Sequence, residues 1–166
     1  MKRPFVKYLL IFLAQAALWN YFNFSQYVIL VFLPAIILCL PMSYSTVRLM
    51  VTAFLTGLVL DFIVTGQLGL TSLALVPVAL LRRPVVRLCF GPELLSRGEE
   101  LSFQRLGLQK FVPAILLMTA LFLLIYLPVD SAGTRPFQFE VLRLLASLAV
   151  STLVSLSVAY LILDVS

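Results

Sequence analysis

Six apolar runs, separated by short polar or charged segments, make up most of this 166-residue chain. A membrane-spanning helix needs roughly 20 apolar residues, with a lower limit near 17, so six fit only if most connections are short. Only 11% of the residues are charged, against roughly 25% in soluble domains, so most of the surface must face lipid. We therefore predict an all-α bundle of six transmembrane helices that forms one membrane domain, residues 1–166. The expected helices span residues 4–19, 27–40, 47–65, 68–81, 111–129 and 141–163.

Three of these runs depart from an ordinary spanning helix. The first contains Ala14-Gln15-Ala16, which resembles a signal-peptidase site, but its apolar character continues to Trp19, and we expect an uncleaved helix. The second contains Pro34, where a kink is expected. The fourth is so short that its length alone fits a re-entrant segment better than a crossing.

The unequal distribution of basic residues sets the expected orientation. Loops rich in Lys and Arg stay in the cytoplasm, and the expected loop 82–110 carries more basic than acidic residues. Its basic residues are Arg82, Arg83, Arg87, Arg97, Arg105 and Lys110. With both termini in the cytoplasm, only Arg135 and Arg143 of the twelve basic residues lie outside. The short fourth run must then cross, because any other arrangement exports a basic cluster.

Several function classes are disfavoured by what the chain lacks. It has no histidine, and Cys39 and Cys89 show neither paired nor metal-ligand spacing, so we expect no enzyme, no metal and no cofactor. The formal charge of +5 is divided among segments between apolar runs, which fits membrane orientation better than nucleic-acid binding. We expect membrane lipid around the chain, no nucleic-acid partner and no small-molecule substrate.

The loop 82–110 has the pattern of a further helix. Ser96 and Glu99 have capping-box spacing, and Arg105 and Lys110 lie where the helix dipole favours basic residues. We predict a helix over residues 97–110. It either lies against the membrane or a partner through its apolar residues, or is a solvated connector.

The third expected helix carries two small residues and an acid on one face. Ala53, Gly57 and Asp61 recur every four residues, and small side chains let a neighbouring helix approach closely. Asp61 falls in the outer third of the bilayer, where an ionised carboxylate still needs a reason. Two interpretations remain open: the side chain reaches the outer headgroups, or it pairs with Arg143 on the sixth helix.

The sixth expected helix bears Ser147, Ser151 and Ser155, again at intervals of four. This weakly polar stripe favours close helix packing over a proton or substrate path, because no charged residue accompanies it at the midplane. Gln15 in the first helix is explained by a hydrogen bond between helices.

The third and fourth runs and the residues after them contain three notable stretches: Gly57-Leu58-Val59-Leu60-Asp61, Gly66-Gln67-Leu68-Gly69-Leu70 and Arg82-Arg83-Pro84. Together they resemble the core of MreD, the small membrane protein of bacterial rod-shape determination, and the six-helix layout extends the resemblance over nearly the whole chain. It implies a non-enzymatic scaffold of cell-wall elongation in the inner membrane. The implied partners are MreC, the actin-like MreB, and RodA with its penicillin-binding transpeptidase. Gly57, Asp61 and Gly69 are the positions carried over by the resemblance.

A different class stays open as the alternative. MreD-like proteins are similar in architecture to the substrate-binding components of energy-coupling-factor vitamin transporters, which also have six helices. A site for a polar vitamin should bring polar groups together at the outer ends of several helices. The outer loops of this chain offer few, so the scaffold is favoured.

Overall fold

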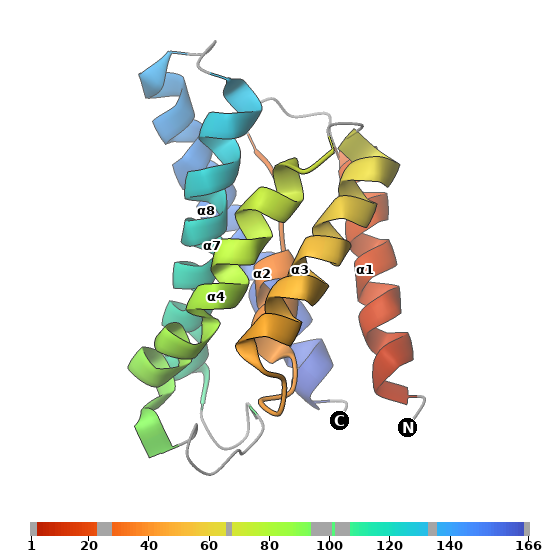
Figure 1. The fold of residues 1–166 in the computed structure, drawn as a ribbon. Helices are drawn as coiled ribbons and strands as arrows, with labels where there is room; N and C mark the ends of the chain where they lie inside the picture. Colours follow the sequence, from red (N-terminus) through yellow and green to blue (C-terminus); the bar gives the residue numbers. More distant parts are fainter. Residues whose placement is uncertain are drawn as a thin grey trace.

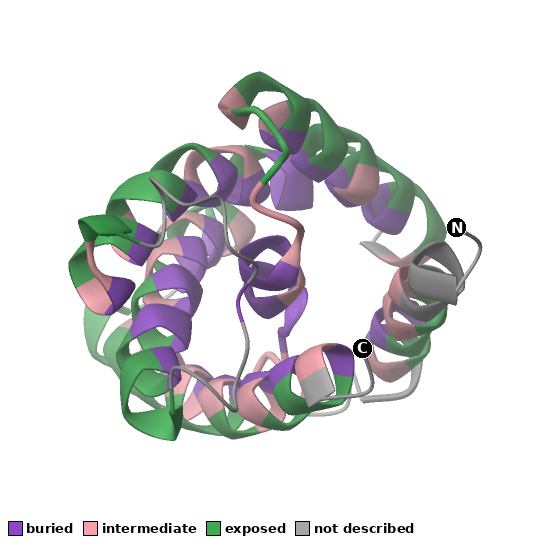
Figure 2. Ribbon diagram, turned by 90° about the horizontal axis from the view of Figure 1, so that it is seen from below, coloured by how far each residue is buried: buried purple, intermediate pink, exposed green. Residues whose placement is uncertain are grey.

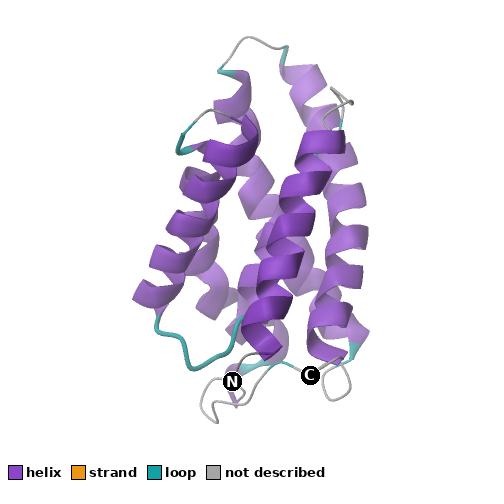
Figure 3. Cartoon of the chain, turned by 90° about the vertical axis from the view of Figure 1, so that its right-hand side faces the viewer, coloured by secondary structure: helices purple, strands orange, loops and turns teal. Residues whose placement is uncertain are grey.

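The computed structural model describes residues 3–22, 28–65, 68–93, 101, 107–132 and 136–164. Within these residues the fold is all-helical, without strands, and its segments run in alternate directions along the bundle (Figure 1, Figure 3). The helices are α1 (Arg3–Phe22), α2 (Leu33–Cys39), α3 (Thr46–Leu60), the π-helical turn η1 (Asp61–Thr65), α4 (Leu70–Phe90), α7 (Leu108–Ser131) and α8 (Phe137–Asp164). The start of α1 and the end of α8 lie at the same end of the bundle.

Three helical stretches in the described part of the chain are long and apolar enough to cross a membrane. They are Thr46–Val64, Leu108–Ser131 and Phe137–Leu163. Their outward surfaces are apolar: Phe62 is 75% exposed and Leu153 is 71% exposed. Exposed residues lie on the outside of the ring of helices, and buried residues face its interior (Figure 2). The predicted all-helical membrane protein is confirmed at this level, and six crossings remain a prediction.

The second apolar run is not the kinked helix that we expected. Residues 28–32 are non-helical, and α2 begins only at Leu33, with Pro34 in its first turn. Proline is favoured there, because the first N–H groups of a helix have no partner within it. Five residues at about 3.3 Å and seven at about 1.5 Å extend roughly 27 Å, close to the thickness of a hydrocarbon core. A run of only twelve residues can therefore be as long as a bilayer core is thick, because its first residues are extended and not helical.

This second segment lies in the interior of the bundle. Val31, Leu33 and Leu38 are each at most 1% exposed. α2 contacts α4, α7 and α8, and Figure 2 shows it inside the ring that the other helices form. The extended residues therefore need hydrogen-bond partners other than water.

The fourth helix is longer than predicted. α4 continues past Leu81 to Phe90 and ends at Gly91, whose φ of 94° breaks the helix. The expected loop 82–110 is therefore wrong in its first nine residues, and the three arginines that it begins with lie on α4 instead.

The predicted helix over residues 97–110 falls mostly outside the described residues. Its last part is different from the prediction, because Gly107 has a φ of 72° and α7 starts directly after it. Leu101, also described, is buried.

Candidate functional site

Asp61 caps the start of α4. Its buried carboxylate accepts the backbone N–H of Gly69 at 2.9 Å and that of Thr71 at 3.0 and 3.1 Å. The first N–H groups of a helix lack partners within the helix, and its positive end favours an anion. Asp61 is 0% exposed, so it does not reach the headgroups as one of our interpretations had it.

Gly57 makes room for the same helix start. A Cβ at this position would lie 2.6 Å from the Cα and N atoms of Ser72, which is closer than atoms can approach. The Ser72 hydroxyl donates to the Phe54 carbonyl at 2.9 Å across the contact. One turn before Gly57, Ala53 is also buried. The small residues on this face of α3 thus let the backbone of α4 pack directly against the backbone of α3.

Gly69 supplies the turn that brings α4 back onto α3. Its φ of 99° lies in the left-handed region that side chains disfavour, while the space around its Cα is open. We call Gly57, Asp61, Gly69, Thr71 and Ser72 the α3–α4 junction. The three positions carried over from the MreD resemblance therefore meet in one structural unit.

The three serines of α8 hold the extended segment 28–32. Ser147 accepts the N–H of Ile29 at 2.9 Å, and Ser151 accepts that of Val31 at 3.0 Å. The Ser151 hydroxyl also donates to the Ile29 carbonyl, and that of Ser155 donates to the Val31 carbonyl. Four helical residues rise about 6 Å and two extended residues about 6.6 Å, so the two repeats match. We call these serines the serine ladder.

The other edge of this segment bonds to α1. Gln15 donates to the Leu30 carbonyl and accepts the N–H of Phe32, at 3.1 and 3.0 Å, and the Trp19 indole donates to Leu30 at 2.7 Å. Our expectation that Gln15 joins two helices is wrong: it joins α1 to non-helical backbone. Non-helical backbone at membrane depth is tolerated where protein groups satisfy it, and here side chains from two helices do so.

Ser151→Ala should lower the free energy of unfolding by about 1–2 kcal/mol, because it leaves the Val31 N–H and the Ile29 carbonyl without this partner. Ser157→Ala is the matched control, since Ser157 is exposed on the same helix and bonds the Leu153 carbonyl within α8. It should change stability by less than about 0.5 kcal/mol. Denaturant unfolding in micelles measures both variants. Equal stability of the two would show that the ladder does not hold the segment.

Arg82 caps the end of α2 from inside the bundle. It is 1% exposed, and its guanidinium donates to the Leu38 carbonyl through Nε at 3.3 Å and Nη2 at 3.0 Å, and to the Leu40 carbonyl. The last carbonyls of a helix lack partners within it and carry the negative end of its dipole. The prediction that Arg82 lies in a loop is therefore wrong: it is a buried residue of α4.

The other basic residues of the expected loop behave differently. Arg83 and Arg87 are exposed on the final turns of α4, and Lys110 is exposed in the first turn of α7. Arg97 and Arg105 lie outside the described residues. Basic side chains thus remain at the end of the bundle where α4 finishes and α7 begins.

Arg143 pairs with Asp130 and not, as we expected, with Asp61. The two atoms Arg143 Nη1 and Asp130 Oδ2 are 2.9 Å apart, joining the end of α7 to the start of α8. Asp61 binds backbone N–H groups of the α3–α4 junction, whereas Asp130 near the end of α7 lies within hydrogen-bond distance of Arg143. Side-chain exposure is 8% for Arg143 and 25% for Asp130, so water screens the pair only in part.

Exchanging the charges of this pair separates the two candidate partners. Asp130→Arg combined with Arg143→Asp should recover about 0.5–1 kcal/mol relative to the sum of the single substitutions. Asp61→Arg combined with Arg143→Asp should recover nothing, because Asp61 binds backbone N–H groups. Thermal unfolding of the three single and two double variants measures both couplings. Recovery by the Asp61 exchange alone would contradict the assignment.

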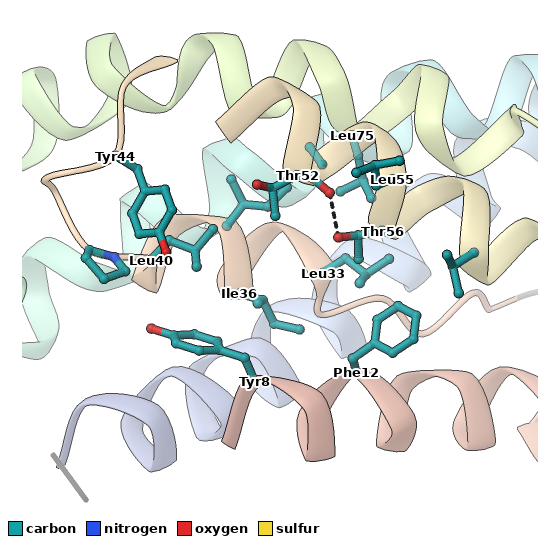
Figure 4. A pocket seen from close by; sticks show the side chains of 14 residues that line it. Tyr8, Phe12, Leu33, Ile36, Leu40, Tyr44, Thr52, Leu55, Thr56 and Leu75 are labelled. Carbon is teal, nitrogen blue, oxygen red and sulfur yellow. Dashed lines mark hydrogen bonds between the residues drawn. The ribbon is translucent and has the colours of Figure 1, made fainter. Parts of the chain in front are cut away.

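An apolar groove lies between α1 and α3, with α2 as its floor. Its volume is about 590 Å³, and it is lined from three sides by Phe12 of α1, Ile36 of α2 and Leu55 of α3 (Figure 4). Tyr8 and Tyr44 stand together at one end, and Thr52 and Thr56 face inward from α3. Their hydroxyls bond backbone carbonyls of α3 itself, at 2.8 and 2.6 Å. The sequence pattern did not indicate this groove, because α3 is apolar on nearly every side.

The comparisons with known proteins add no relative: no family model, no curated protein and no solved structure matches the chain.

Proposed function

We propose that this chain is a multi-pass scaffold of the cell-wall elongation complex in the bacterial inner membrane. In this role it resembles MreD and maintains cell shape through an MreC-type single-span partner, and beyond it MreB, RodA and the penicillin-binding transpeptidase. The observation that carries the proposal is the α3–α4 junction. Three positions of the resemblance, spread over thirteen residues, form this one contact between helices: Gly57, Asp61 and Gly69.

The use of the buried polar side chains supports a scaffold. Asp61, Gln15, Arg82 and the serine ladder all bind backbone groups of the chain itself. They stabilise a bundle whose outer faces are apolar, and apolar helix faces are what a membrane partner would contact. Such a protein acts by shifting the populations of partner conformations.

The orientation proposed for the bundle places both termini in the cytoplasm. Arg48, Arg83, Arg87 and Lys110 are exposed at the same end as the start of α1, as the preference of basic residues for the cytoplasm requires. Asp130 and Arg143 then lie toward the outer surface.

Depletion in the host cell tests the function. Loss of the chain should convert rod-shaped cells to round ones, and the wild-type chain expressed from a second copy should restore rods. Vitamins should not raise the melting temperature of the purified protein. Unchanged rods after depletion, or stabilisation by one vitamin, would favour the transporter subunit instead.

A further inference from the structure

The groove between α1 and α3 has the dimensions of a site for one lipid chain. It follows α3 from Thr52 to Val59, and Arg48 extends the same helical stripe one turn further toward the end where Tyr8 and Tyr44 stand. From Arg48 to Val59 is about 16 Å along the helix, roughly half of a 30 Å hydrocarbon core. The groove therefore covers the depth of one leaflet.

The groove ends before the other end of the bundle, away from Tyr8 and Tyr44, because α1 packs against η1 at that end. Along the floor, α1 packs on α2. A partner transmembrane helix needs a groove through the whole bilayer, whereas an acyl chain ends near the midplane. The volume of about 590 Å³ lies within the range of small-ligand sites, roughly 300–1,000 Å³.

The charge at the open end selects the headgroup. Arg48 is exposed in the first turn of α3, and its guanidinium and the positive end of the helix both attract a phosphate. The N–H of Arg48 itself donates to the Ser45 hydroxyl at 3.4 Å, so the guanidinium is the group offered to the ligand. None of the described residues that line the groove is acidic. Tyrosine rings favour the headgroup level, and Tyr8 and Tyr44 lie at that end.

We propose that this groove binds an anionic phospholipid, with one acyl chain on the apolar floor and the phosphate at Arg48. The lipid belongs to the leaflet that surrounds this end of the bundle. Whether that leaflet is the inner or the outer one follows from the proposed orientation, and the binding site itself does not depend on it. A bound chain fills the space between α1 and α3 and so stabilises the position of α1, which also packs on α2 and η1.

Native mass spectrometry of the full chain with added dioleoylphosphatidylglycerol or dioleoylphosphatidylcholine tests the site. The wild-type chain should retain one phosphatidylglycerol in preference to phosphatidylcholine. Arg48→Gln should retain a lipid but reduce the preference for phosphatidylglycerol about fivefold. This factor corresponds to the binding free energy that one basic residue contributes near an anionic membrane surface, about 1 kcal/mol. Thr56→Trp should fill the groove and abolish retention. Leu153→Trp, on an exposed face of α8, is the control and should behave as wild type.

A photoreactive amino acid in place of Leu55 identifies the occupant in cells, independently of how the tryptophan variant folds. The expected product is the chain with the added mass of a phospholipid. A product with a protein would overturn the proposal and assign the groove to a partner helix. Equal retention of both lipids by the wild-type chain and Arg48→Gln would overturn the assigned headgroup site. Neither result depends on cell shape, so failure here leaves the scaffold function standing.

Discussion

Gly57→Leu will prevent α3 and α4 from packing, and even Gly57→Ala will unfold more easily than the wild-type chain. In an ordinary helix interior, Gly→Ala stabilises by roughly 0.5–1 kcal/mol. Here the added Cβ would lie 2.6 Å from the backbone Cα and N atoms of Ser72, and overpacking of this kind costs about 1–3 kcal/mol. The alanine variant should therefore lose stability where the helix alone would gain it. Thermal and denaturant unfolding in micelles measure the sign.

A second substitution shows whether the contact is with backbone. Gly57→Ala combined with Ser72→Gly removes the serine side chain but leaves its Cα and N atoms in place, so stability should not return. Leu58→Ala is the control on the neighbouring, partly exposed position, and should change stability by less than about 0.5 kcal/mol. A Gly57→Ala protein at least as stable as the wild type would show that α4 does not approach α3 this closely.

Arg82→Ala will lower the free energy of unfolding by about 3 kcal/mol. The substitution removes a buried guanidinium and leaves the Leu38 and Leu40 carbonyls without its hydrogen bonds, and bonds to charged groups contribute about 1.5–3 kcal/mol. Arg82→Lys should recover less than half of the loss, because one ammonium group does not reproduce the planar fork of donors. Unfolding in micelles measures the series.

Arg83→Ala is the matched control for this series, since Arg83 follows Arg82 on α4 and is exposed. It should change stability by less than about 0.5 kcal/mol. Equal effects of the two alanine substitutions would place Arg82 in solvent, as the sequence alone had suggested.

The positions of the helices were largely predictable, because long apolar runs leave few alternatives. Thr46–Val64, Leu108–Ser131 and Phe137–Leu163 coincide closely with three of the runs. The face of Ala53, Gly57 and Asp61 follows from helical periodicity alone. Its partner does not: Asp61 binds N–H groups eight and ten residues later, and this depends on where η1 ends and how Gly69 turns the chain.

The extended segment 28–32 was not predictable from local pattern. A short apolar run reads equally as buried helix or buried strand, and only a partner decides between them. That partner is the serine ladder of α8, more than a hundred residues away in the chain. Arg82 was misplaced for a related reason, because a charge count treats every arginine as solvated, whereas the end of α2 binds this one.

The scaffold function is tested most directly by isolating the tagged chain from the membranes of its own cells, with the surrounding bilayer retained in polymer-bounded discs. We predict a single-span partner of the MreC type in a fixed ratio to the chain. Leu58→Ala should retain this partner, and Gly57→Leu should lose it together with the fold. Recovery of the folded wild-type chain with the subunits of a vitamin transporter, or without any single-span partner, would contradict the proposed function.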